Sequence, residues 1–289
     1  MKTRYRLLVN IALFSSIALA SAIAQSDSTA LQLAQKEQEF SQSAAERGFI
    51  SAFLAYFDDS CIAFYPQPEN AKHALIGEPE SQASLVWWPT FVEVSASGDF
   101  GFTTGPSEYR AGGISDSLAY YGHFVSVWKK RGDGKWDVIL DVGSSYPKVE
   151  RRTEELETKQ LSTHEMKNAV LVDTGRAGMM AADRAFTFLV QTQGAGAALQ
   201  KFASDNVRVY RKGTFPTKGK NKGLDLVRNE EPMRCGFFAG NISSSRDLGF
   251  TCGVAVEAPS DTSTYIRIWE KENVWKVAVD VRKPWPATK

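Results

Sequence analysis

The sequence predicts two consecutive domains of the α+β class, each with helices first and a bent antiparallel sheet after them. The main observation is an internal repeat. The segment Tyr121–Pro147 returns as Thr264–Pro286, with tryptophan, aspartate and proline at matching positions. Two shorter blocks return in the same order, residues 97–105 as 245–253 and residues 57–65 as 202–210. A repeat of roughly 140–150 residues corresponds to a complete domain rather than to a solenoid.

Each predicted domain opens with a helical pattern. Apolar residues recur near helical spacing over residues 29–57, and Gly48 is expected to separate two helices there. Residues 179–190 have the same pattern in the second domain, and residues 197–202 predict a second short helix after a break.

Antiparallel strands are expected to follow the helices. Residues 92–97 and 100–109 flank a Ser-Gly-Asp turn in the first domain. Residues 120–129 and 136–142 flank Arg131-Gly132-Asp133-Gly134, which is a hairpin signal. These turns join neighbouring strands and therefore predict an antiparallel sheet.

The first 24 residues have the pattern of a signal peptide. A basic start precedes an apolar run over residues 7–20, and Ala22-Ile23-Ala24 offers a cleavage site. An uncleaved anchor is the alternative, although the run is short for a membrane span. We expect an exported protein, periplasmic or secreted, with no membrane contact after cleavage. Its expected parts are a first domain over 25–147, a charged linker over 148–167 and a divergent second domain over 168–289.

The two halves differ in charge. Residues 25–147 carry 8 basic and 16 acidic side chains, whereas residues 165–289 carry 19 basic and 13 acidic ones. The halves are therefore expected to attract each other and dock, unless the difference reflects independent drift of two surfaces. The basic cluster over residues 208–222 has the pattern of a solvated loop and lacks interleaved exposed aromatic residues, so no nucleic-acid partner is expected.

The three cysteines permit one disulfide. Cys235 and Cys252 flank an expected turn, and an oxidising compartment would preserve a bridge between them. Their unequal distances from the turn leave the bridge open, because geometry decides it. No spacing of cysteines and histidines is typical of a metal site, so neither a metal nor a cofactor is expected.

The segments Gly98–Gly105 and Tyr121–Gly143, with the opening helices, resemble the NTF2-like superfamily, and within it the SnoaL-like and DUF4440 proteins. The resemblance covers nearly all of residues 25–147 and is looser over residues 179–286. It implies that each half is a cone, in which a strongly bent sheet wraps a long helix and leaves a pocket at the open end. The family includes isomerases, dehydratases, cyclases and non-catalytic modules, so the resemblance assigns no reaction.

His123 and Asp141 are the candidates for catalysis. If Trp128 pairs with Trp136 across the hairpin, His123 lies opposite Asp141 on one face of the sheet. The carboxylate would then raise the pKa of His123, as a general base or proton shuttle requires, while burial would oppose the shift. A structural hydrogen bond is the alternative, and a slip of one residue would separate the pair.

The candidates for lining a pocket in the first domain are Tyr65, Trp87, Trp88, Tyr109 and Tyr121. Aromatic residues in strands also serve as ordinary core, so both interpretations stay open.

The leading interpretation is a protein that binds a small hydrophobic or aromatic ligand in the cavity of the first domain, without an assigned reaction. One alternative is an isomerase, dehydratase or cyclase that uses His123 as acid/base, oriented by Asp141. Another is a structural pseudo-dimer without a ligand, in which the first domain docks on the second. Assembly into a homo-oligomer is compatible with each of these interpretations.

Overall fold

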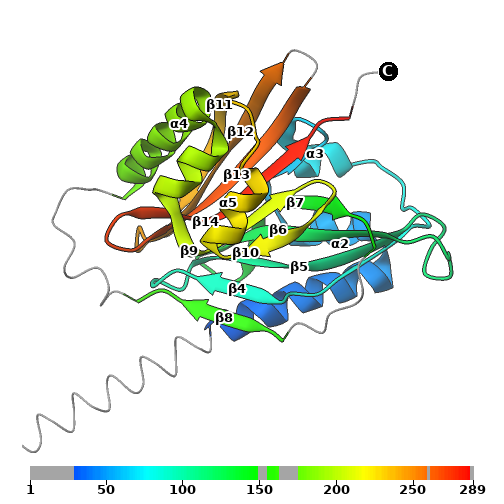
Figure 1. Ribbon diagram of the computed structural model, residues 1–289. Coiled ribbons are helices and arrows are strands. Elements are labelled where there is room, and N and C mark those ends of the chain that lie inside the picture. The colour runs from blue at the N-terminus through cyan, green and yellow to red at the C-terminus, as the bar shows by residue number, and fades with distance from the viewer. Residues whose placement is uncertain (1–28, 149–154, 163–174, 259–260, 287–289) are drawn as a thin grey trace, which may run out of the picture.

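The computed structural model describes residues 29–148, 155–162, 175–258 and 261–286. The expected signal peptide, residues 1–24, lies outside the described residues. Within these ranges, no helix is long and apolar enough to cross a membrane. The described chain forms two sheets with helices on them (Figure 1). We call residues 29–162 the first unit and residues 175–286 the second unit.

The first unit has a helix over residues 29–47 and an eight-stranded sheet of order β2-β1-β7-β6-β5-β4-β8, with β3 also paired to β5. Its remaining elements are α2 (Phe49–Tyr56), β1 (Phe57–Phe64), β2 (Pro68–Asn70), α3 (Ala71–Leu75), β3 (Ser84–Trp87), β4 (Phe91–Val94), β5 (Phe100–Arg110), β6 (Tyr120–Lys130), β7 (Trp136–Tyr146) and β8 (Glu157–Gln160).

The second unit has a six-stranded sheet of order β10-β9-β14-β13-β12-β11. Its elements are α4 (Arg176–Phe202), β9 (Ala203–Arg211), β10 (Thr214–Lys218), α5 (Lys220–Val227), β11 (Arg234–Ile242), β12 (Leu248–Ala258), β13 (Asp261–Lys271) and β14 (Trp275–Pro284). The first sheet without β3 and β8 has the equivalent order, with β1 parallel to β7 as β9 is to β14.

Glycine divides the helices in both units, as the sequence predicts. Gly48 separates the helix over 29–47 from α2 at a φ of 90°. Gly194 has a φ of 83° and kinks α4, which is two helices across that residue. A positive φ of this size is accessible to glycine but strained for residues with a Cβ.

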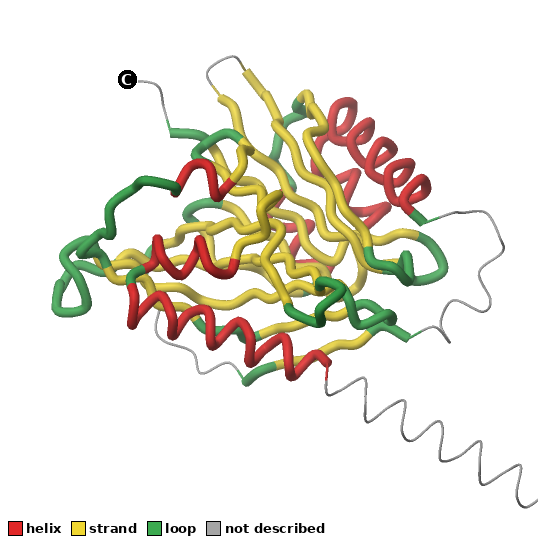
Figure 2. Tube along the Cα trace, turned by 180° about the vertical axis from the view of Figure 1, so that it is seen from behind, coloured by secondary structure: helices red, strands yellow, loops and turns green. Residues whose placement is uncertain are grey.

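The strands carry apolar side chains on both faces, so both faces of each sheet are buried. On β6, Phe124 and Trp128 contact the helix side, while Val125 and Val127 point the other way. The result is four layers, with helices outside and the two sheets inside (Figures 1 and 2).

The facing surfaces of the two sheets share one buried hydrophobic cluster. Its largest fully buried members are Phe100, Phe102, Leu140, Tyr210 and Phe250. Full burial of such an apolar side chain contributes about 1.5–3 kcal/mol, so this shared cluster is a main source of cohesion between the units.

The repeated turns of the two units contact each other reciprocally. The Ala96 amide donates to Asp247 (2.9 Å), and the Ser244 amide donates to Asp99 (3.3 Å). The Ser97 and Ser245 hydroxyls lie 2.8 Å apart, although these turns are almost 150 residues apart in the chain. Reciprocal contacts between equivalent positions are the pattern of a two-fold interface.

Part of the segment expected to be a charged linker instead forms β8. This strand pairs in parallel with β4, and the Glu157 amide donates to the Thr90 carbonyl (3.0 Å). Leu161 directly after it is buried in the cluster between the sheets. The strand was missed because its side chains are mostly charged or polar, while its pairing uses the backbone alone.

The repeat block over residues 57–65 and 202–210 was aligned one residue out of register. Phe57 pairs with Val138 in the first unit as Ala203 pairs with Val277 in the second, so Tyr65 corresponds to Arg211 rather than to Tyr210. Side-chain similarity suggested the alignment, whereas strand pairing defines the true correspondence.

The prediction of a possible Cys235–Cys252 bridge is wrong. Cys235 pairs with Ala255 and Cys252 with Ala239, and both thiols are free, as is that of Cys61. Cys252 belongs to the cluster between the sheets, while Cys235 packs toward the helices of the second unit. The two thiols therefore lie on opposite faces of the sheet.

Candidate functional site

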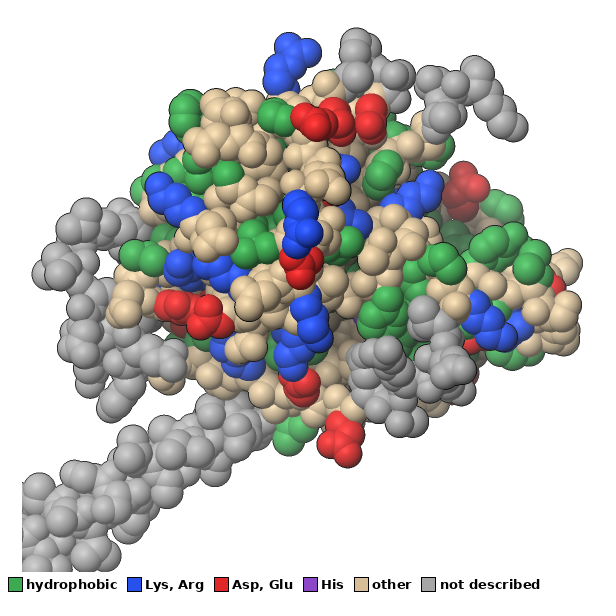
Figure 3. All heavy atoms as spheres, viewed as in Figure 1, with side chains coloured by type: hydrophobic (Ala, Val, Ile, Leu, Met, Phe, Trp, Pro, Cys, Tyr) green, Lys and Arg blue, Asp and Glu red, His purple; other side chains and the backbone are tan. Residues whose placement is uncertain are grey.

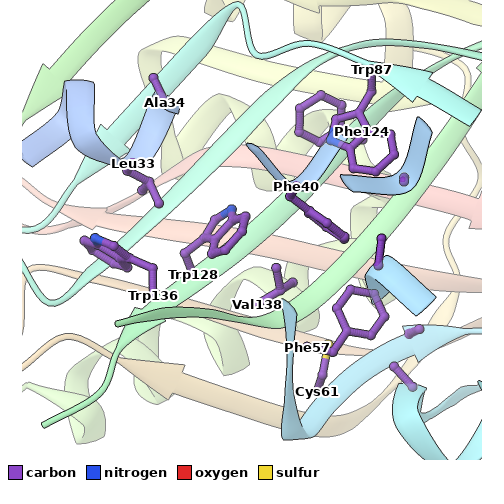
Figure 4. Close-up of a cluster of buried hydrophobic side chains, with 14 of the residues drawn as sticks. Leu33, Ala34, Phe40, Phe57, Cys61, Trp87, Phe124, Trp128, Trp136 and Val138 are labelled. Carbon is purple, nitrogen blue, oxygen red and sulfur yellow. The ribbon is translucent and has the colours of Figure 1, made fainter. Parts of the chain in front are cut away.

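The space between the helices and the sheet of the first unit is filled by aromatic side chains. Phe40 lies at its centre, with ring centroids 4.9 Å from Trp87, 6.0 Å from Trp128 and 4.7 Å from Tyr56 (Figure 4). The buried members of this cluster pack between the helices and the sheet. The inner part of the first unit is therefore core.

A carboxyl group is buried within this aromatic cluster. Glu37 accepts hydrogen bonds from the Trp87 indole (2.5 Å), the Trp128 indole (2.9 Å) and the Thr103 hydroxyl (2.5 Å). Burial raises the pKa of Glu37 to about 7. Glu37 is fully buried and bonded to side chains of the core, so we interpret it as a structural residue.

A cavity of about 560 Å³ opens at the end of the first unit, where it meets the second unit. We call it the mouth cavity. Tyrosine and proline dominate its lining, and both units contribute. The residues that line it are Phe64, Tyr65, Pro66, Ser107, Tyr109, Tyr120, Tyr121, Gly122, Gly143, Ser144, Ser145, Lys212, Lys283, Pro284 and Pro286.

Strand ends of the first unit hold the tyrosines in place. Tyr109 on β5 and Tyr120 on β6 form the last pair between these two strands, and their ring centroids lie 6.3 Å apart. Tyr65 follows β1 directly and Tyr121 follows Tyr120 on β6. Tyr65 and Tyr120 are 50% and 55% exposed, so their rings are available to a ligand rather than sealed in core.

Contacts between the units close the other side of the mouth cavity. The Thr264 hydroxyl donates to the Pro66 carbonyl (3.1 Å), and the Gly213 amide donates to the Ser145 carbonyl (2.7 Å). The Lys283 ammonium donates to the Phe64 carbonyl (3.4 Å). These bonds fix the end of β14 and the turn after β9 against the first unit.

Three of the five predicted pocket residues line the mouth cavity, namely Tyr65, Tyr109 and Tyr121. The other two do not. Trp87 is buried against Glu37, and Trp88 precedes β4 with its amide bonded to the Pro106 carbonyl.

Sequence reasoning missed the residues that the second unit contributes. Lys212 follows β9, and Lys283 is the last residue but one of β14, close to prolines that also line the cavity. The repeat offered a weak signal for Lys283. Lys283 pairs with Thr264 as Ser144 pairs with His123, so Lys283 is the equivalent of a residue that lines the cavity. Only the docked arrangement brings the lysines to the tyrosines of the first unit.

The predicted His123–Asp141 pair does not exist. His123 pairs with Ser144 and Asp141 with Ser126, so the two side chains lie on opposite faces of the sheet. The cause is a pairing register that differs from the Trp128–Trp136 one, with a further shift next to Trp128. Catalysis by this pair is therefore excluded.

Asp141 lies on the helix side of the sheet and accepts a hydrogen bond from the Ser126 hydroxyl (2.7 Å). Burial raises the pKa of Asp141 to about 6.

His123 instead lines a second cavity of about 470 Å³ between the sheets. Its ring centroid lies 5.1 Å from that of Phe215 and 5.5 Å from that of Tyr146. Burial lowers the pKa of His123 to about 4, opposite to the shift that the carboxylate would have produced. His123 is thus neutral near pH 7 and packs as an aromatic group.

The charged groups beside this second cavity pair with one another. Glu157 on β8 lies 2.6 Å from the Lys218 ammonium and 3.5 Å from the Arg208 guanidinium, which stacks 3.4 Å above the Phe91 ring centroid. Figure 3 shows basic and acidic side chains intermixed on one face of the molecule. Among the described residues, no cluster of histidine, cysteine and carboxylate groups could hold a metal ion.

No protein-family model matches the sequence, and no curated protein matches it. Similar solved structures include an NTF2-like protein of unknown function from Shewanella oneidensis MR-1, with a TM-score of 0.32 and 11% identity, over 38% of this chain and 98% of that one. An NTF2-like protein from Cytophaga hutchinsonii ATCC 33406 has a TM-score of 0.32 and 13% identity, over 39% of this chain and all of that one. A hexachlorocyclohexane dehydrochlorinase has a TM-score of 0.32 and 16% identity, over 39% and 86%. Likeness at this level assigns no activity to this chain.

Proposed function

We propose that this chain is an exported protein of two tandem NTF2-like cones, which binds a small hydrophobic or aromatic ligand in the mouth cavity. The observation that carries the proposal is the cavity of about 560 Å³ with its lining of tyrosine, phenylalanine and proline. Small-molecule sites are usually concave and mostly apolar, with a few polar groups that orient the ligand.

The equivalent strand orders of the two sheets support the tandem arrangement, and so do the repeated sequence blocks. The reciprocal contacts between the Ser97 and Ser245 turns support descent from a symmetric pair of domains. Export rests on the sequence pattern of residues 1–24, and mass spectrometry of the protein from its source should find a mature terminus near Gln25.

The site that we propose includes residues of the second unit, which the sequence did not suggest. Phe40 and its neighbours fill the interior of the first unit, so the ligand would bind at the open end, against the second unit. Since His123 and Asp141 lie on opposite faces of the sheet, we restrict the proposal to binding.

A neutral aromatic probe tests the proposal directly. Cinnamamide titrated into the wild-type protein should bind, as followed by isothermal titration calorimetry. Ser145→Trp places a large ring in the cavity and should abolish this binding, while its thermal unfolding confirms that it is folded. Equal binding to both proteins, or to neither, would refute binding in the mouth cavity.

The structural pseudo-dimer remains a second candidate, because the interior of the first unit is filled and the units share a buried cluster. If mutual support is the only role of the two units, they should unfold in one cooperative transition and no probe should bind. Two resolved transitions in calorimetry would count against it.

A further inference from the structure

The charged side chains that line the mouth cavity have one sign. Lys212 and Lys283 are the charged residues among the described lining residues, and no carboxylate accompanies them there. The second cavity differs, since its arginine and lysine are neutralised by Glu157. The mouth cavity therefore combines an aromatic wall with two lysine side chains and no carboxylate among its described lining residues.

Lys283 is partly buried and incompletely bonded. Within the described part of the chain it forms one hydrogen bond, to the Phe64 carbonyl at 3.4 Å, although an ammonium group has three donors. No carboxylate of the described residues lies within ion-pair distance of it. Burial lowers the pKa of Lys283, the charge of Asp141 opposes this shift, and the charge of Lys212 lowers the pKa further. An anion in the cavity would compensate this desolvated charge.

A buried hydroxyl provides an independent observation. Ser144 lines the same cavity and is 6% exposed, yet its hydroxyl has no hydrogen-bond partner among the described residues. Buried polar groups normally have a partner, so this hydroxyl indicates that something polar belongs beside it.

We propose that the mouth cavity takes an aromatic carboxylate. The ring lies among the tyrosines of the first unit, and the carboxylate binds Lys283 and Lys212 of the second unit, with Ser144 donating its hydroxyl. The site is composite, because one unit supplies the aromatic wall and the other the charge. This inference rests on the proposed function, since it names the class of ligand for the same cavity.

Cinnamate and cinnamamide test the charge requirement, because they share a ring and differ in the anionic group. By isothermal titration calorimetry, cinnamate should bind the wild-type protein at least about tenfold more tightly, since hydrogen bonds to charged groups are the stronger ones. Lys283→Met should remove this preference while leaving cinnamamide binding unchanged. Lys212→Met, at an exposed position, should reduce it. Lys276 lies on β14, as Lys283 does, but outside the cavity, so Lys276→Met should leave the preference for cinnamate intact.

The two proposals fail in different ways. The carboxylate site is wrong if cinnamamide binds, cinnamate binds no more tightly, and Lys283→Met and Lys212→Met bind both probes as the wild type does. The proposal of an aromatic cavity would stand in that case. If neither probe binds, or Ser145→Trp binds both as the wild type does, the proposed function itself is wrong.

Discussion

The interiors of the two units hold a carboxylate at the same place but stabilise it differently. In the first unit, Glu37 is surrounded by neutral donors, two tryptophan indoles and a threonine hydroxyl. In the second unit, Asp183 accepts from the Thr251 hydroxyl (2.7 Å) and pairs with the Arg267 guanidinium (2.8 Å). One interior therefore depends on neutral hydrogen-bond donors, the other on a buried ion pair.

A second pair of equivalent carboxylates shows the same contrast. Asp280 is 2.7 Å from the Arg211 guanidinium and 3.8 Å from that of Arg267. Its counterpart Asp141 accepts a hydrogen bond from the Ser126 hydroxyl and has no arginine partner among the described residues. Strand pairing places Ser126 at the position of Arg267.

At the mouth cavity, the first unit has other residues where the second unit has arginine. Tyr65 stands where the second unit has Arg211, and Gly143 stands where it has Arg282. Both Tyr65 and Gly143 line the cavity. The same strand framework thus carries arginine–carboxylate pairs in one unit and borders the mouth cavity in the other.

The largest expected effect tests the ion network. Arg267→Met should cost about 3–5 kcal/mol of stability, because it leaves Asp183 buried without its cation. The matched change Ser126→Ala removes only a hydrogen bond to Asp141 and should cost about 1 kcal/mol. Urea denaturation measures both, and equal costs would show that the two interiors do not differ in this way.

The next effect concerns pH and the neutral interior. Burial raises the folded-state pKa of Glu37 from its ordinary value of 4.5 to about 7. The folded protein therefore holds a proton that the unfolded chain releases, so this group makes stability fall as pH rises from about 4.5 to about 7 and contributes no further slope above that.

Glu37→Gln keeps a neutral side chain and should remove this dependence. Relative to the wild type, it should gain about 3 kcal/mol between pH 4.5 and pH 8, at 1.36 kcal/mol for each unit of pKa shift. Denaturation at several pH values measures the difference, and Glu46→Gln on the exposed side of the same helix is the control. A difference that does not vary with pH would contradict the raised pKa.

A smaller effect distinguishes the two repeated turns. Asp247 is 1% exposed and accepts from the Ser243 and Ser245 hydroxyls as well as from the Ala96 amide. Asp99 is less buried. Asp247→Ala should therefore cost about 2–3 kcal/mol and Asp99→Ala about 1 kcal/mol, because unsatisfied buried donors are the main loss. Thermal unfolding that ranked them in the opposite order would show that the turns do not contribute as their burial indicates.

The smallest expected effect is that of a reducing agent. All three cysteines are free, so dithiothreitol should leave the thermal midpoint unchanged. The denatured protein should react with three equivalents of a thiol reagent before any reduction. A single reactive thiol would indicate a bridge and a different packing of the second sheet.

Much of the fold could be predicted from the sequence, because its signals are local. Gly48 breaks the first helical segment as expected, and the turns around Gly98 and Gly134 join the strands that the pattern indicated. Register could not be predicted, since the shift next to Trp128 depends on how the sheet bends against its helix. That shift moved Asp141 away from His123.

The candidate site was predictable only in its aromatic half. Tyr65, Tyr109 and Tyr121 were found because they lie in or directly after recognisable strands of one domain. Lys212 and Lys283 reach the cavity only through docking of the other unit. β8 was missed as well, because a polar edge strand carries no apolar pattern.

The reciprocal turn contacts have a consequence for mass action. In a dimer of separate subunits, such an interface forms at a rate and to an extent that depend on protein concentration. Here Ser97 and Ser245 belong to one chain, so the partner surface is always present at a high effective concentration. Dilution cannot separate the lysines of one unit from the tyrosines of the other, and the composite cavity persists in a single molecule.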